Sequence, residues 1–265
     1  IDVASIPGDV FTVTMKYMDE EIYTITFQKN VEDTFAGGDG CEEHPYLIAN
    51  ARQLKMVEND LSAHYRLIAD IDVNGAMYTM GSEEEAFSGT FNGNGYKIER
   101  LTVYSLPEDE NNLTRTPITG LFACLSEDGE IKNLTLKDYK LSALEDDDGV
   151  GLESDQTSFY VGGLVGINEG TIINCSIVGN SSIEFTRSKS KDSNRSLSTY
   201  VGGIAGENLG VIGYCSIDGL TISADTSSFE FGANSAAENK NKLYAGGIAG
   251  HGTGAITHCR VSENT

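Results

Sequence analysis

The sequence lacks tryptophan, has only 4 prolines and contains no long apolar segment. The scarcity of proline and the absence of a strict glycine triplet exclude collagen and a proline-rich linker, although 30 residues are glycine. No apolar run approaches the ~20 residues that a helix needs to cross a bilayer. The first ten residues have no basic or apolar region of the kind found in a signal peptide, and we interpret the chain as a fragment.

Positive charge is also scarce. The 18 Lys and Arg residues stand against 40 Asp and Glu residues, for a formal net charge of −22. Nucleic-acid binding is excluded on this ground, because contacts to phosphate need clustered basic side chains. The same charge disfavours binding to an anionic membrane surface and favours solubility.

Cysteines are few, and none forms a CxxC pair. The five lie at positions 41, 124, 175, 215 and 259, and the four histidines are scattered. This pattern predicts no Cys/His zinc site, and the odd count argues against a disulfide framework. Whether Cys41 and Cys124 are paired stays open.

A repeat organises most of the chain. Three segments align without gaps: YVGGLVGINEGTIINCSI from Tyr160, YVGGIAGENLGVIGYCSI from Tyr200 and YAGGIAGHGTGAITHCRV from Tyr244. A diverged fourth copy begins at Thr119. The second half of the unit, an apolar residue with others at +3 and +5, recurs from Ile68, Ile98, Ile131, Ile172, Ile212 and Ile256. Self-similarity of this kind indicates a repeat architecture.

The repeat unit alternates as a strand does, with apolar residues at +3 and +5 facing a core. The GGLVG run predicts a first strand, the run around the cysteine a second, and Ile183–Thr186 a third. Coils of this kind stack in register, and parallel connections favour a right-handed wind. The predicted fold class is all-β, a right-handed parallel β-solenoid (β-helix) of about six coils.

The N-terminal part predicts two further features. Residues 10–27 alternate as two strands of a β-hairpin around Asp19-Glu20-Glu21. Asn50 and Gln53 resemble a capping box, which predicts a short capping helix over about 51–60. We expect residues 1–36 to form the hairpin segment or the remnant of a preceding domain. Residues 37–265 would then form the solenoid, which continues in the full-length protein.

The repeats resemble GLUG repeats, which are named for a Gly-Leu-x-Gly strand. That strand corresponds here to 163–166, 203–206 and 247–250. The resemblance covers about residues 38–265, and it departs from the pattern at Thr119 and Ala123. It implies a secreted or surface-anchored bacterial protein, such as an adhesin or the non-catalytic N-terminal region of an IgA-cleaving metallopeptidase. It supplies no catalytic residues.

One repeat position holds either cysteine or leucine. We expect the side chains there to form a ladder inside the core: Leu101, Leu134, Cys175, Cys215 and Cys259. The exchange of Cys for Leu indicates small core hydrophobes rather than metal ligands.

The length in excess of the repeat falls at one place in each unit, at 144–158, 187–199 and 225–242. Such inserts project from one side and either bind a partner or are tolerated surface loops. The first insert is acidic and is a candidate calcium site through Asp146, Asp147 and Asp148. Solvated carboxylates are the alternative. Basic and aromatic side chains on the other two inserts are candidate binding residues: Arg187, Lys189, Lys191, Arg195, Phe229 and Phe231.

No catalytic motif of a known class is present, and the chain is not expected to be an enzyme. The favoured function is an extracellular interaction module that binds a host protein or glycan. The alternative is a structural or substrate-positioning domain of a larger secreted metallopeptidase. A carbohydrate-active β-helix enzyme is the third hypothesis. Apart from the candidate calcium, no cofactor is expected.

Overall fold

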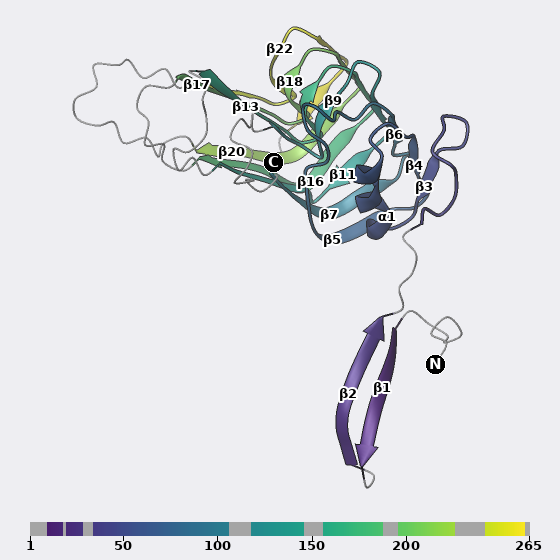
Figure 1. Cartoon of the computed structure of the whole chain (residues 1–265). Coiled ribbons are helices and arrows are strands. Elements are labelled where there is room, and N and C mark those ends of the chain that lie inside the picture. The colour runs from purple at the N-terminus through teal and green to yellow at the C-terminus, as the bar shows by residue number, and fades with distance from the viewer. Residues whose placement is uncertain are drawn as a thin grey trace, which may run out of the picture. The chain divides into compact units, whose positions relative to one another are not determined.

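Strands make up nearly all of the regular structure in the described part of the chain (Figure 1). The structure, a computed structural model, describes residues 10–17, 20–28, 34–105, 118–145, 156–187, 196–225 and 242–262. The chain divides into two compact units, Ile1–Thr34 and Phe35–Thr265.

The first unit contains the hairpin. Strands β1 (Val10–Tyr17) and β2 (Glu20–Gln28) pair antiparallel, with Val10 opposite Gln28 and an irregularity between Met15 and Lys16. Alternating apolar and polar residues with an acidic turn between them explain why these residues form a hairpin.

The second unit consists of parallel sheets that share the successive repeats. One, the β3–β23 sheet, has the order β23-β19-β15-β10-β6-β4-β3. Its strands are β3 (Tyr46–Ile48), β4 (Tyr65–Leu67), β6 (Thr90–Asn92), β10 (Glu130–Lys132), β15 (Thr171–Ile173), β19 (Val211–Gly213) and β23 (Ala255–Thr257). Its register places one side chain of each strand in a column: Tyr46, Tyr65, Phe91, Ile131, Ile172, Ile212 and Ile256. Tyr65 and the column residues from Phe91 to Ile212 are buried, and Ile256 at the end of the stack is exposed.

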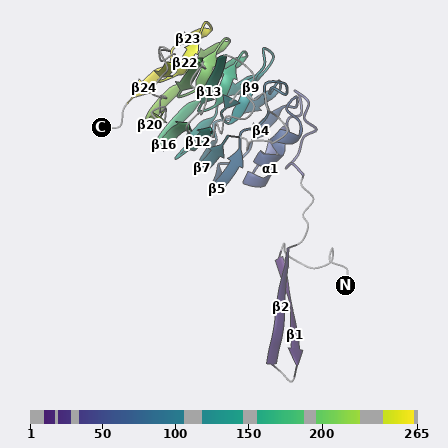
Figure 2. The same cartoon turned by 60° about the vertical axis from the view of Figure 1, so that its left-hand side comes forward.

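A second sheet, the β5–β24 sheet, holds the longest strands. They are β5 (Ile71–Tyr78), β7 (Lys97–Tyr104), β11 (Thr135–Lys137), β12 (Lys140–Glu145), β16 (Ser176–Arg187), β20 (Ser216–Asp225) and β24 (Arg260–Ser262). Figure 2 shows β5, β7, β12, β16, β20 and β24 side by side in chain order.

Two four-stranded sheets complete the repeats. The β8–β21 sheet contains β8 (Ile118–Thr119), β13 (Gln156–Gly162), β17 (Ser196–Gly202) and β21 (Lys242–Gly246). The β9–β22 sheet contains β9 (Phe122–Leu125), β14 (Val165–Asn168), β18 (Ala205–Asn208) and β22 (Ala249–Gly252). A repeat therefore passes through four sheets, for example β13, β14, β15 and β16, and stacks on the next repeat strand by strand. Parallel sheets that share stacked repeats define a β-solenoid-like fold.

The structure differs from the expected three-strand coil at the run that contains the cysteine. That run is not one strand, because Asn174 adopts the left-handed conformation (φ 55°) between β15 and β16. The expected third strand, Ile183–Thr186, is in turn the second half of β16. Asparagine tolerates positive φ, and this explains how the chain turns a corner in the middle of an apparently alternating segment.

A short helix packs into the core beside the N-terminal strands of the stack. Helix α1 (Ala51–Lys55) is followed by a 3₁₀ turn, η2 (Met56–Asn59). The Asn50 side chain accepts a hydrogen bond from the Gln53 backbone N–H, and the Gln53 side chain accepts one from Ala49. Leu54 and Val57 are fully buried, so the helix contributes apolar side chains to the core.

Candidate functional site

The chain leaves the stack at neighbouring points in successive repeats. The parallel register aligns Ser142 with Tyr104, Glu145 with Arg187, and Thr186 with Asp225. In-register parallel strands lie about 4.8 Å apart, so the C-terminal ends of β7, β12, β16 and β20 follow one edge.

The chain also returns at neighbouring points. Tyr160 pairs with Ile118, Gln156 with Ser196, and Ser198 with Lys242, at the beginnings of β8, β13, β17 and β21. In Figure 1 the strands β13, β16, β17 and β20 extend toward the same side of the stack. We call these exit and return points together the insert edge.

The strands extend further into the expected inserts than the sequence predicts. Strand β13 already begins at Gln156, and β17 begins at Ser196. The segments outside the described strands are 146–155, 188–195 and 226–241. Residues 106–117, which separate β7 from β8 in the sequence, were not among the expected inserts.

Most predicted binding residues lie outside the described residues. This holds for the candidate calcium ligands and for five of the six basic and aromatic candidates: Asp146, Asp147, Asp148, Lys189, Lys191, Arg195, Phe229 and Phe231. Arg187 is the last residue of β16, where its backbone pairs with Glu145 of β12.

The structure brings four of the five predicted ladder residues into equivalent positions. Leu134 and Cys175 are fully buried, Cys215 is 1% exposed and Cys259 is half-buried. The register of the flanking strands relates these residues from coil to coil. Each cysteine thiol donates a hydrogen bond to the carbonyl oxygen two residues before it, those of Ile173, Gly213 and Thr257. Leucine fills the same space but cannot make this bond.

The fifth residue, Leu101, does not lie in this column. Ile98 pairs with Leu136 and Thr102 with Lys140, so Leu101 occupies the position of Tyr139, one corner further along the coil. The two corners share a local pattern, because Arg100 (φ 53°) and Asn133 (φ 54°) each adopt positive φ before a buried leucine. Similar corners at different places in the coil explain the misalignment.

The buried thiols differ in their pKa values: those of Cys124 and Cys175 are raised, whereas the hydrogen bond with Cys175 lowers the pKa of Cys215. The hydrogen bond to Cys215, together with burial, holds the pKa of Cys175 well above its ordinary value. Burial raises the pKa of Cys124 to about 12. All five cysteines are free. The raised pKa values of Cys124 and Cys175 make these two thiols poor nucleophiles, because the thiolate is the reactive form.

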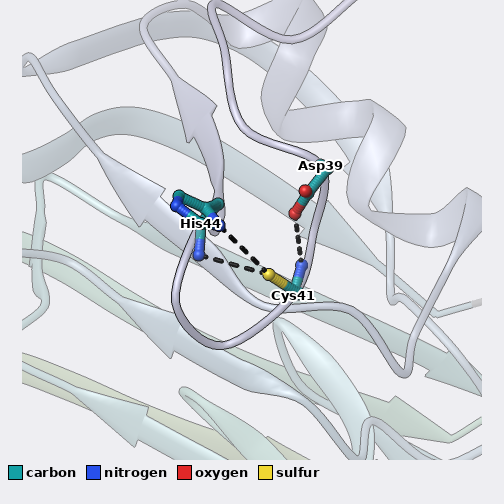
Figure 3. Close-up of side chains that lie close together, drawn as sticks. All are labelled: Asp39, Cys41 and His44. Atoms are coloured by element: carbon teal, nitrogen blue, oxygen red, sulfur yellow. Dashed lines mark hydrogen bonds between the residues drawn. The ribbon is translucent and has the colours of Figure 1, made fainter.

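A cluster of potential metal ligands lies outside the repeats. Asp39, Cys41 and His44 share one surface loop, and their ligand atoms all lie within 4.8 Å of one another (Figure 3). The Cys41 Sγ is 3.6 Å from the His44 Nδ1, and it accepts a hydrogen bond from the His44 backbone N–H at 3.3 Å. The Asp39 Oδ1 accepts a hydrogen bond from the Cys41 backbone N–H at 3.1 Å.

The charges in this loop are coupled. The hydrogen bond between the Asp39 and Cys41 side chains lowers the pKa of Asp39 and raises the pKa of Cys41. The cluster was not predicted from the sequence, because it contains no CxxC pair. The spacing Asp-x-Cys-x-x-His was the available signal, with a carboxylate as the third ligand.

Within the described part of the chain, no helix has the length and apolar character needed to cross a bilayer. The geometry thus defines a repeat protein of stacked parallel strands with an insert edge and one ligand cluster.

Comparison with known proteins identifies the repeat. Residues 157–183 match the model of the GLUG motif. This segment is therefore a GLUG motif, as the resemblance of its sequence indicates.

Two curated proteins are similar to the chain. One, from Evansella cellulosilytica, is named "Putative Gly-rich membrane protein" and is 32% identical over 168 residues, which are 59% of this chain and 17% of that protein. The other is Halomucin of Haloquadratum walsbyi, 30% identical over 156 residues, which are 54% of this chain and 2% of that protein. The chain thus matches a small part of each relative.

One solved structure, titled a putative immunoglobulin A1 protease from Bacteroides ovatus, aligns with a TM-score of 0.47 and 17% identity. The alignment covers 87% of this chain and 80% of that one. A likeness of this size bears on neither fold nor activity.

Proposed function

We propose that this chain is a non-catalytic extracellular interaction module that binds a host protein or glycan through its insert edge. The register of the strands carries the proposal. The described strands end and begin again at aligned positions in successive repeats, so the chain leaves and re-enters the stack along one edge. In repeat proteins, insertions confined to one face often form the binding surface.

The relatives support an extracellular or surface location. One is named a membrane protein and the other Halomucin, and both are named without reference to an enzymatic activity. The described strands that frame the insert edge also carry little charge of one sign, so specificity would come from the inserts themselves. Their basic and aromatic residues, Lys189, Lys191, Arg195, Phe229 and Phe231, are the proposed contacts, with Arg187 at the margin.

The proposal includes the finer architecture. We propose that the solenoid is right-handed and has about six coils. In the division expected from the sequence, it comprises residues 37–265. The strong preference for right-handed parallel connections supports the hand. A crystal structure of the chain decides both the hand and the number of coils.

A replacement experiment tests the binding surface. Residues 188–195 and 226–241 are exchanged for Gly/Ser segments of equal length, which keeps β16, β17, β20 and β21 intact. The unmodified chain is first screened on a glycan array and a panel of extracellular matrix proteins. We expect the exchanged chain to lose binding to every hit while its melting temperature changes by only a few degrees.

The control exchanges charge elsewhere on the stack. Glu130 and Lys132 form an ion pair on β10, and Glu130→Lys with Lys132→Glu reverses it without touching the insert edge. This double variant should bind as the unmodified chain does. Binding that survives the loop exchange, or that is lost only in the control, contradicts the proposal.

A further inference from the structure

The loop from Gly38 to Pro45 gathers three chemically different ligands within six residues. A carboxylate oxygen comes from Asp39, a sulfur from Cys41 and an imidazole nitrogen from His44. This set is more selective than a cluster of acids. Calcium and magnesium prefer oxygen ligands alone, whereas a thiolate with an imidazole favours zinc and similar transition metals.

The distances fit one metal ion. With a Zn–S bond of ~2.3 Å and a Zn–N bond of ~2.05 Å, tetrahedral geometry places the sulfur and nitrogen about 3.6 Å apart. The observed separation between the Cys41 Sγ and the His44 Nδ1 is 3.6 Å. A single ion can therefore contact both atoms without movement of the backbone.

The backbone holds the loop in this shape. The Asp39 and Gly40 N–H groups both donate to the His44 carbonyl oxygen, at 3.0 and 3.1 Å. Gly38 (φ 83°) and Gly40 (φ 86°) adopt the left-handed conformation, and a Cβ on Gly38 would lie 2.0 Å from the Pro45 carbonyl oxygen. Only glycine fits there, so the turn that brings the ligands together is built into the sequence.

The loop is also fixed to the stack. The Gly40 carbonyl oxygen accepts a hydrogen bond from the His64 N–H, and the Tyr46 N–H donates to the His64 carbonyl oxygen. The rings of Phe35 and Tyr46 stack with centroids 4.3 Å apart. Ligands on an anchored loop lose little freedom when they bind a metal, which favours affinity.

We propose that Asp39, Cys41 and His44 bind one Zn²⁺ ion through an Asp39 carboxylate oxygen, the Cys41 Sγ and the His44 Nδ1. The thiol proton of Cys41 passes to solvent on binding, and the His44 imidazole is neutral with its proton on Nε2. The loop lies at the surface, so water takes the fourth position. The site tethers the chain segment that precedes β3, and it is independent of the insert edge.

Cobalt is the spectroscopic probe. The full chain, with its thiols kept reduced and free of metal, is titrated with Co²⁺ and then with Zn²⁺. We expect one equivalent of Co²⁺ to produce a thiolate-to-cobalt charge-transfer band and tetrahedral d–d bands, and Zn²⁺ to displace them. Zn²⁺ should also raise the melting temperature, because a ligand that binds the folded state stabilises it.

Three substitutions test the ligands one by one: Asp39→Asn, Cys41→Ser and His44→Gln. Each should weaken Co²⁺ binding by more than about tenfold, since even outer-shell partners of a metal contribute 10–100-fold. The matched controls are Cys259→Ser and His258→Gln, which alter a half-buried thiol and an exposed imidazole at the other end of the stack. Circular dichroism checks that every variant is folded.

Each outcome of these titrations either supports or contradicts the proposed zinc site. Loss of the bands in all three ligand variants, with both controls unchanged, supports the site. A charge-transfer band that persists in Cys41→Ser, unchanged affinity in Asp39→Asn, or no binding by the folded chain overturns it.

Discussion

The core of the stack is filled in two different ways. In the N-terminal coils, residues 46–105, large aromatic rings pack against one another. The ring centroid of Tyr65 is 6.3 Å from that of Phe87 and 6.5 Å from that of Phe91. The ring centroid of Phe91 is in turn 5.7 Å from that of Phe122 in the following coil. In the C-terminal repeats, the column that contains Tyr65 and Phe91 continues as isoleucine. Both regions contribute strands to the β3–β23 and β5–β24 sheets.

The difference shows that backbone pairing, and not the identity of the core residues, defines this fold. The aromatic region depends on side chains that fit one another at single positions. The repeats depend on small residues that let identical backbones stack closely. We therefore expect different kinds of substitution to destabilise the two regions, and the following variants test this.

The largest effect is expected in the aromatic region. Phe91→Ala removes a fully buried ring that contacts both Tyr65 and Phe122, and it should lower the free energy of unfolding by about 3–5 kcal/mol. Urea denaturation followed by circular dichroism measures the change. Ile172→Val, in the same column within the repeats, should cost only about 0.5–1.5 kcal/mol. Equal losses would remove the distinction between the regions.

The repeats should instead be sensitive to added volume at a glycine. A Cβ on Gly202 would lie 1.9 Å from the Ala205 carbonyl oxygen and 2.7 Å from the Gly250 nitrogen, both backbone atoms. Gly202→Ala should therefore cost about 1–3 kcal/mol in the same urea assay. Gly213→Ala is the control, because its Cβ would come no closer than 3.4 Å to Thr257. Tolerance at Gly202 would show that close stacking is not required.

The cysteine column should respond according to burial. Cys215→Ser places a hydroxyl at a site that is 1% exposed, and it should cost about 1–2 kcal/mol because the hydroxyl retains the Gly213 carbonyl as acceptor. Cys259→Ser, at a half-buried site, should cost less than half as much. Thermal melts of the two variants give the comparison, and equal shifts would contradict it.

The smallest effect is expected outside the core. Tyr200 stacks on Tyr160 and Tyr244, with centroids 5.2 and 5.0 Å apart, so Tyr200→Ala should cost about 1 kcal/mol. Tyr214 is 60% exposed and adopts positive φ, a conformation that asparagine tolerates. Tyr214→Asn should therefore change the unfolding free energy by less than ~0.5 kcal/mol. A larger loss at Tyr214 than at Tyr200 is the contrary result.

The same two regions explain which predictions from sequence succeeded. The GLUG assignment and the all-β, parallel architecture are confirmed, because three segments that align without gaps reveal the repeat. In the aromatic region no such copy exists, and Leu101 was aligned to Leu134 on a local pattern that two different corners share. The four-strand repeat was missed for a related reason, since the corner at Asn174 leaves the alternation of side chains intact.

The ligand cluster could have been found only in part. The spacing of Asp39, Cys41 and His44 is visible in the sequence, but spacing alone does not show that the side chains converge. The positive φ of Gly38 and Gly40, and the two hydrogen bonds to the His44 carbonyl oxygen, close the loop. The predicted contacts on the inserts stay predictions.

The sequence by itself determined the repeat, the period of the strands and the absence of a basic surface, because these follow from composition and from the order of side chains along the chain. Only the tertiary structure decided which strands lie in register, where each corner falls, and that the strands end and begin again along one edge. The physical reason is that parallel pairing joins residues about 40 positions apart. The hydrogen bonds that select one register over another therefore cannot be predicted from a short stretch of sequence.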